Sequence, residues 1–133
     1  MCLKILLVDC SWLVRDRLRG LIAALPHTAV VAHADTEGAA RQHLQTHSPE
    51  LVVIDPQLRS GSGFAVISHV KSKHPGVTIM VLTNRIYPEY RARCQALGAH
   101  YFFDKSKETA AFVAQLGHLC EPLPLPLPRA CHA

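Results

Sequence analysis

Short apolar runs alternate along the chain with longer segments in which apolar residues recur at every third or fourth position. The short runs predict five strands, at residues 4–8, 28–34, 51–54, 77–82 and 101–103. The third run, Leu51-Val52-Val53-Ile54, is apolar throughout, which is typical of a parallel strand covered on both faces. Because proline cannot donate to a strand ladder, Pro56 ends this strand and leaves Asp55 at its carboxyl end.

The longer segments predict five helices, each with one apolar face, and several of their ends carry clear signals. Pro26 ends the first helix, Ser48-Pro49 ends the second, and Gly98 stops the fourth. Ser106 is expected to cap the last helix at its amino end. The apolar face of that helix holds Phe112, Val113, Leu116, Leu119 and Cys120.

This alternation predicts an α/β fold, a doubly wound five-stranded parallel sheet with helices on both faces. Pattern alone does not give the strand order, but the flavodoxin-like order 2-1-3-4-5 fits five repeats best. We expect one domain over residues 1–120. Residues 121–133 alternate proline with leucine and predict an extended, polyproline-like tail that the domain does not need in order to fold.

Composition and charge narrow the function classes. No apolar run approaches the roughly 18 residues that span a bilayer, and the amino terminus has no signal-peptide pattern, so we expect a cytoplasmic protein without a membrane partner. The formal net charge is +4, but no block of five or six basic residues is present, so direct nucleic-acid binding is not expected.

Cysteine and histidine give no sign of a structural metal site. The five cysteines are odd in number and lack C-x-x-C spacing, which argues against both a disulfide framework and a zinc site. The nine histidines fall mainly at loop or polar-face positions, and none is assigned to a metal.

Polar residues stand at the ends of four predicted strands. Asp9 follows the first, Asp55 the third, Thr83 the fourth and Lys105 the fifth. In a parallel sheet these ends share one crevice, and two carboxylates placed close together call for a cation, for which Mg²⁺ is the natural choice. Together with the ammonium of Lys105 and the hydroxyl of Thr83, such a site suits a phosphoryl group carried on a carboxylate.

These motifs, in this order and spacing, resemble the receiver domain of two-component response regulators. The resemblance covers about residues 3–120, and no single motif is specific by itself. It is carried by Leu6-Leu7-Val8-Asp9, Val52-Val53-Ile54-Asp55, Gly63, Val81-Leu82-Thr83, and Leu97-Gly98-Ala99 followed by Lys105.

The resemblance implies that Asp55 accepts a phosphoryl group from a phosphohistidine on a sensor histidine kinase or a phosphotransfer protein. It also implies that Mg²⁺ is held by Asp9, Asp55 and the backbone carbonyl of Gln57. Phosphorylation would draw Thr83 inward and let Phe102 change rotamer, although a plain core-packing role for Phe102 fits equally well. The protein would signal by altered binding to a downstream protein, or as a homodimer, and would not be a turnover enzyme.

The sequence departs from the family at four positions. Three departures, at Arg59, Asn84 and Ser106, resemble ordinary variation. The fourth is Cys10, which stands where the family usually has a second acidic residue; its soft sulfur is a poor Mg²⁺ ligand, so metal binding is expected to be weak.

Two alternatives to a phosphorylated switch follow. One is a degenerate receiver that binds other proteins without phosphorylation because Cys10 has disabled the metal site. The other is a flavodoxin-like cofactor carrier, which is disfavoured because neither Asp9-Cys10-Ser11 nor the loop at residues 60–63 forms a phosphate-cradling loop. The thirteen residues after Cys120 are too few for a helix-turn-helix output module, so a stand-alone receiver or a fragment is expected. Lys105 is expected to matter more for the switch than for the fold.

Overall fold

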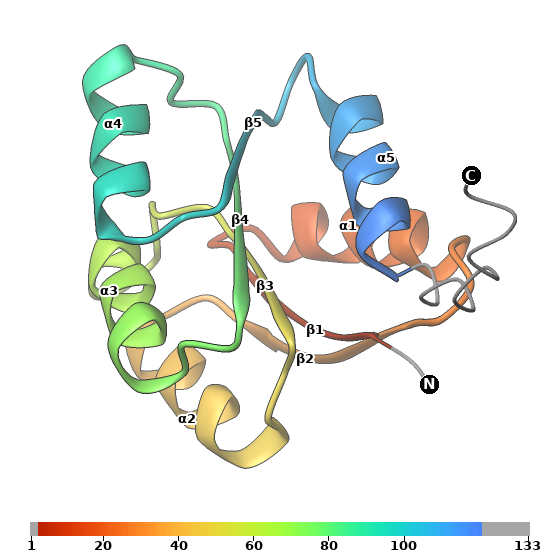
Figure 1. Cartoon of the computed structure of the whole chain (residues 1–133), viewed down its shortest axis with the longest axis horizontal. Helices are drawn as coiled ribbons and strands as arrows, with labels where there is room; N and C mark the ends of the chain where they lie inside the picture. The colour runs from red at the N-terminus through yellow and green to blue at the C-terminus, as the bar shows by residue number, and fades with distance from the viewer. Residues whose placement is uncertain (1–2, 121–133) are drawn as a thin grey trace, which may run out of the picture.

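The computed structural model describes residues 3–120 as a five-stranded parallel sheet in the order β2-β1-β3-β4-β5 (Figure 1). The predicted fold class and strand order are therefore confirmed. The strands are β1 (Leu3–Val8), β2 (Thr28–Ala34), β3 (Leu51–Ile54), β4 (Thr78–Thr83) and β5 (Tyr101–Asp104). The predicted tail at residues 121–133 lies outside the described residues, as do Met1 and Cys2.

Five helices cover the two faces of the sheet (Figure 1). α1 (Trp12–Ala23) and α5 (Thr109–Cys120) pack on one face. α2 (Glu37–His47), α3 (Gly63–Lys73) and α4 (Pro88–Leu97) pack on the other. No helix in the described part of the chain is long and apolar enough to cross a membrane.

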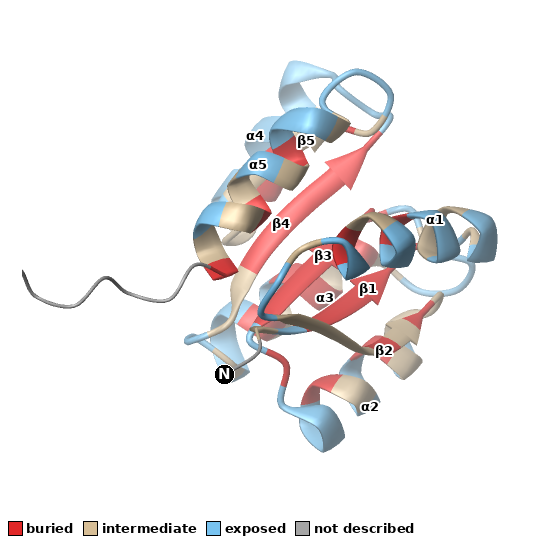
Figure 2. Cartoon of the chain, turned by 90° about the vertical axis from the view of Figure 1, so that its right-hand side faces the viewer, coloured by how far each residue is buried: buried red, intermediate tan, exposed pale blue. Residues whose placement is uncertain are grey.

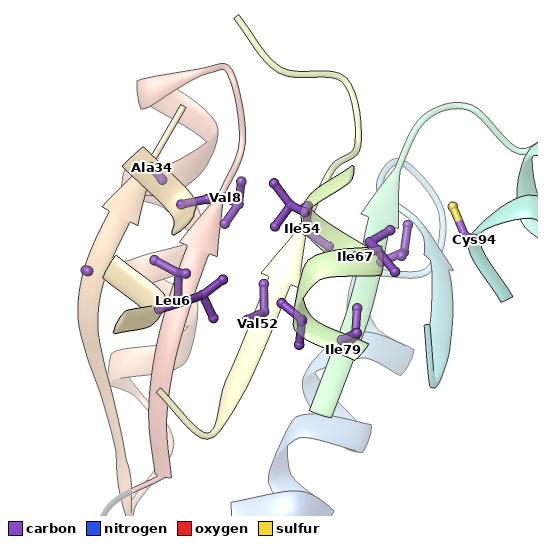
Figure 3. Close-up of a cluster of buried hydrophobic side chains, with 14 of the residues drawn as sticks. Leu6, Val8, Ala34, Val52, Ile54, Ile67, Ile79 and Cys94 are labelled. Atoms are coloured by element: carbon purple, nitrogen blue, oxygen red, sulfur yellow. The ribbon is translucent and has the colours of Figure 1, made fainter. Parts of the chain in front are cut away.

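The sheet separates two hydrophobic cores. Side chains that alternate along β1, β3 and β4 contribute to each core in turn, as the two-residue period of a strand requires. Figure 3 shows the core beneath α2, α3 and α4, with Leu6, Val52, Ile54, Ile67 and Ile79 meeting between strand and helix. The opposite core is built around Phe112 of α5, which is fully buried.

The central position of β3 follows from its composition. All four residues of β3 are buried, and β3 pairs with β1 on one side and with β4 on the other (Figure 2). A strand without a polar residue can lie only where helices cover both of its faces. Asp55, the residue after β3, therefore lies at the centre of the edge formed by the carboxyl ends of the strands.

Serine and threonine side chains start three of the helices as N-caps. The hydroxyls of Ser11, Thr36 and Ser62 accept hydrogen bonds from the amides of Val14, Ala39 and Ala65, which lie three residues further along the chain. The prediction that Ser106 caps the last helix is wrong. α5 begins at Thr109, and the amide of Ser106 is instead held in a turn by Asp104 while its hydroxyl donates to the side chain of Asn84 at 2.6 Å.

Gly63 lets the loop after β3 fold back against the strand end. Its amide donates to the carbonyl of Pro56 at 3.0 Å, and a Cβ at this position would lie 2.2 Å from the Cα of Pro56. Any side chain would therefore displace the backbone next to Asp55. Glu37 of α2 secures the same loop by accepting a hydrogen bond from the amide of Ser62 at 3.0 Å.

Candidate functional site

The four polar strand ends come together at one edge of the sheet. The Nζ of Lys105 donates to Asp9 Oδ2 and to Asp55 Oδ2, each at 2.7 Å. The hydroxyl of Thr83 donates to Asp55 Oδ1 at 3.2 Å. Asp9, Asp55 and Thr83 are only 3%, 8% and 1% exposed. All four side chains that the sequence places in the crevice are therefore linked in one chain of hydrogen bonds.

A common local turn orients these side chains. The carboxylates of Asp9, Asp55 and Asp104 each accept a hydrogen bond from the amide two residues further on, at 2.9, 3.0 and 2.8 Å. The hydroxyl of Thr83 accepts one in the same way from the amide of Arg85, at 3.2 Å. Short oxygen-bearing side chains favour such turns where a strand ends. The turns hold one oxygen of each side chain, and in Asp9 and Asp55 the second oxygen is left to point into the crevice.

Lys105 is the counter-ion of the crevice. Burial acts to lower the pKa of Lys105, but hydrogen bonds and charge attraction to Asp55 and Asp9 outweigh it, so the net shift of the pKa is upward. The ammonium therefore stays charged at neutral pH. Because its side chain is only 16% exposed, it neutralises the two carboxylates where water screens them poorly.

The carboxylates also provide hard oxygen ligands of the kind that Mg²⁺ prefers. One ammonium already lies within 2.7 Å of both Asp9 Oδ2 and Asp55 Oδ2, which shows that a single cation can contact the two carboxylates at once. The donor set thus fits a divalent cation, but with two carboxylates. Cys10 is exposed, and within residues 3–120 no group of three His, Cys, Asp or Glu side chains is arranged as a metal site.

The sequence did not indicate two residues that hold Lys105 in place, Asp104 and Glu108. Asp104 is 8% exposed and accepts from the amides of Ser106 and Lys107, while Glu108 accepts from the amide of Asp104 at 2.9 Å. The sequence does contain a pattern that indicates the turn at Asp104. Asp104-Lys105-Ser106 has the same Asp-x-Ser pattern as Asp9-Cys10-Ser11. This turn aims Lys105 back at the crevice.

Two arginines add positive charge around the crevice, and neither was singled out from the sequence. Arg15 of α1 donates to the backbone carbonyl of Asp9 at 2.6 Å, and Arg85 donates to the side-chain carbonyl of Gln57 at 3.0 Å. Gln57, Arg85 and Tyr90 also line a groove of about 290 Å³ next to Pro56. Burial, assisted by the charge of Asp55, raises the pKa of Tyr90 to about 12, so its phenol is neutral.

Phe102 lies in the core, away from the crevice. It is 8% exposed, pairs with Val81 of the neighbouring strand and belongs to the core beneath α2, α3 and α4. The guanidinium of Arg91 lies 5.5 Å from the centre of its ring. Tyr101 and Phe103 point to the opposite face. Phe102 is therefore the aromatic residue of β5 that packs beneath α4.

Comparison with known proteins agrees with this geometry. The family described as "Response regulator receiver domain" matches residues 5–116. The chain belongs to the response regulator receiver family. The predicted resemblance is thereby confirmed, and the matched receiver domain takes up most of the chain.

Individual relatives agree in fold. A LuxR-family two-component response regulator from Aurantimonas sp. SI85-9A1 superposes with a TM-score of 0.80 at 28% identity, over 90% of this chain and 86% of that one. The response regulator domain of Thermotoga maritima CheB gives a TM-score of 0.77 at 17% identity, over 90% of this chain and 94% of that one, and shows the fold alone.

The curated relatives are longer proteins. The Fimbriae Z protein of Salmonella typhimurium is 26% identical over 79% of this chain and 50% of its own length. The protein-glutamate methylesterase/protein-glutamine glutaminase of Bordetella pertussis is 32% identical over 79% of this chain and 30% of its own length. The chain thus spans half or less of these curated relatives.

Proposed function

We propose that this receiver accepts a phosphoryl group on Asp55 from a phosphohistidine of a sensor histidine kinase or phosphotransfer protein. The observation that carries the proposal is the position of Lys105, whose ammonium contacts the carboxylates of Asp9 and Asp55 while Thr83 donates to Asp55 from the other side. A carboxylate held between an ammonium and a hydroxyl has partners ready for the oxygens of an incoming phosphoryl group.

In the transfer, an Asp55 oxygen forms a bond to phosphorus as the phosphorus–nitrogen bond of the phosphohistidine breaks. The departing imidazole nitrogen keeps the electron pair, and the product is an acyl phosphate on Asp55. Lys105 neutralises charge on the phosphoryl oxygens from its place between the carboxylates. Mg²⁺, held by Asp9, Asp55 and the backbone carbonyl of Gln57, would supply further charge neutralisation when bound.

The phosphoryl group gives Thr83 a new acceptor. Its hydroxyl now donates to Asp55 Oδ1, and after transfer it would donate to a phosphoryl oxygen. Movement of Thr83 affects β5, because Thr83 pairs with Asp104 and the neighbouring Val81 pairs with Phe102. In this proposal, Phe102 repacks beneath α4 and thereby changes a surface that a downstream protein or a second copy of the chain reads.

An apolar rim offers a docking surface for the phosphodonor. Among residues 3–120, the large hydrophobic side chains that are more than half exposed are those of Trp12, Leu13, Ile86 and Tyr87. They lie in the segments that follow β1 and β4, next to Asp9 and Thr83. Exposed apolar side chains grouped around a charged crevice are typical of a protein-binding site. We expect the protein to act in the cytoplasm, in keeping with its three free cysteines among the described residues.

Intact-mass spectrometry tests the proposal. The protein is incubated with a small phosphodonor such as acetyl phosphate, with Mg²⁺ and separately with EDTA. We expect one added phosphate with Mg²⁺ and a much slower reaction with EDTA. Absence of phosphate at every donor and metal concentration would reject the proposal.

That negative result would favour a second candidate, a receiver that binds its partner without phosphorylation. The contacts of Lys105 are the observation in its favour, because the ammonium already occupies the oxygens that face the crevice, and Cys10 offers no third carboxylate. The two candidates differ in one measurable respect. Partner binding would depend on phosphorylation in the first and be independent of it in the second.

A further inference from the structure

A groove lined by polar and charged residues lies between α2 and α3 and shares no residue with the phosphorylation crevice. These two helices lie side by side in Figure 1, and both begin near the carboxyl ends of the strands. The groove begins near the middle of α2, at Arg41, and extends to the carboxyl-terminal end of α3, at Lys73 and His74. Its volume is about 450 Å³, and it is lined by Arg41, Gln42, Gln45, His69, Lys73 and His74.

The charge of this lining is one-sided. Arg41 and Lys73 are permanent cations at neutral pH, His69 and His74 become cations on protonation, and the lining includes no carboxylate. Glu37, the first residue of α2, does not line the groove, but its carboxylate binds the Arg41 guanidinium at 3.0 Å and offsets part of its charge. Lys73 forms no ion pair within the described part of the chain. The groove is therefore complementary to negative charge.

The hydrogen bond between Arg41 and His69 fixes which histidine nitrogen is available. Arg41 Nη1 lies 3.1 Å from His69 Nδ1, and arginine can only donate, so Nδ1 accepts and the neutral ring carries its proton on Nε2. The His69 and His74 rings lie 5.4 Å apart. Both rings are half-buried, and the Nε2–H of His69 is a donor that its bond to Arg41 leaves free.

Gln42 and Gln45 indicate what kind of anion fits. Each carries an amide that can donate and accept at once, and they lie three residues apart on α2, so they face the same side of the helix. Compact anions such as inorganic phosphate would use only the donors. An extended peptide would use both, with its carboxylates on Arg41 and Lys73 and its backbone on the two glutamines. We propose that the α2–α3 groove binds an extended acidic segment of a partner protein, independently of the phosphorylation crevice.

Fluorescence anisotropy with a labelled hexaglutamate peptide tests this proposal on the full chain. We expect saturable binding that weakens as salt is added, and no binding of a hexalysine peptide. The double variant Arg41→Gln, Lys73→Gln should weaken binding roughly fivefold, since each exposed ion pair contributes little alone. The control Arg17→Gln, Lys107→Gln removes the same two charges from exposed positions elsewhere and should change affinity less than twofold.

NMR titration of the histidine rings supplies a second readout. Burial, followed by the charges of Arg41, His74 and Lys73, holds the pKa of His69 below its usual value, while Glu37 acts in the opposite direction. Bound carboxylates must raise that pKa. Equal loss of affinity in both double variants, or an unchanged His69 titration with peptide bound, would overturn the proposal. If inorganic phosphate at matched charge displaced the labelled peptide as well as unlabelled hexaglutamate does, the groove would be a simple anion site, and the proposal would also be overturned.

Discussion

Replacing Lys105 with alanine is expected to lower the free energy of unfolding by about 3 kcal/mol in the absence of divalent cations, because it leaves two buried carboxylates without their shared partner. The sequence alone favours a mild effect on the fold, on the view that the crevice is open. The contacts change this expectation, since Asp9 and Asp55 are 3% and 8% exposed and both bind the same ammonium.

Urea denaturation with and without Mg²⁺ checks this result. A divalent cation that binds the two freed carboxylates in the folded state should restore much of the lost stability, as any ligand of the native state does. The matched control is Lys107→Ala, which removes an exposed lysine two residues away and should leave stability within about 0.5 kcal/mol of wild type. A Lys105→Ala variant as stable as wild type, or one that gains nothing from Mg²⁺, would contradict the role assigned to this ammonium.

Replacing Cys10 with aspartate is expected to tighten Mg²⁺ binding about tenfold or more and to speed phosphorylation. A third carboxylate beside Asp9 and Asp55 adds one negative charge where the family usually has one. At an effective dielectric constant of about 20, that charge contributes a few kcal/mol of attraction to a nearby cation. Desolvation offsets part of the gain, and a net of about 1.4 kcal/mol corresponds to the tenfold change.

Trp12 provides the signal for this measurement. Its side chain is 69% exposed and lies two residues from Cys10, so its fluorescence can be followed during a Mg²⁺ titration. Cys10→Asn is the matched control, because asparagine has the size of aspartate without its charge. The asparagine variant should bind Mg²⁺ about as weakly as wild type. Equal affinity in wild type and Cys10→Asp would rule out the missing carboxylate as the cause of weak binding.

Much of the fold could be predicted because each strand has a distinct pattern. β3 is apolar along its whole length and must lie at the centre, whereas β2 mixes buried with half-buried residues and lies at an edge. The start of α5 was missed for a physical reason. Serine is a good N-cap by residue type, but the carboxylate of Asp104 accepts a hydrogen bond from the amide of Ser106 and holds residues 104–106 in a turn instead of a helix. Competition between two nearby capping side chains cannot be judged from residue type alone.

The site could be predicted at the level of which residues meet, but not how they bond. Parallel topology brings Asp9, Asp55, Thr83 and Lys105 to one edge whatever their rotamers. That Lys105 bridges both carboxylates, and that Arg85 reaches Gln57, depends on the loops after β4 and β5. Those loops are shaped by their own hydrogen bonds, such as the one from Ser106 to Asn84.

Locating the modified residue shows whether Asp55 carries the phosphoryl group. Borohydride reduces an acyl phosphate on aspartate to homoserine with release of phosphate, and peptide mapping then identifies the altered residue. We expect homoserine at position 55 in the wild type, none in Asp55→Asn, and a wild-type yield of homoserine in Asp16→Asn, which changes an exposed aspartate. Homoserine at Asp9 or Asp104, or undiminished phosphate in Asp55→Asn, would contradict this expectation.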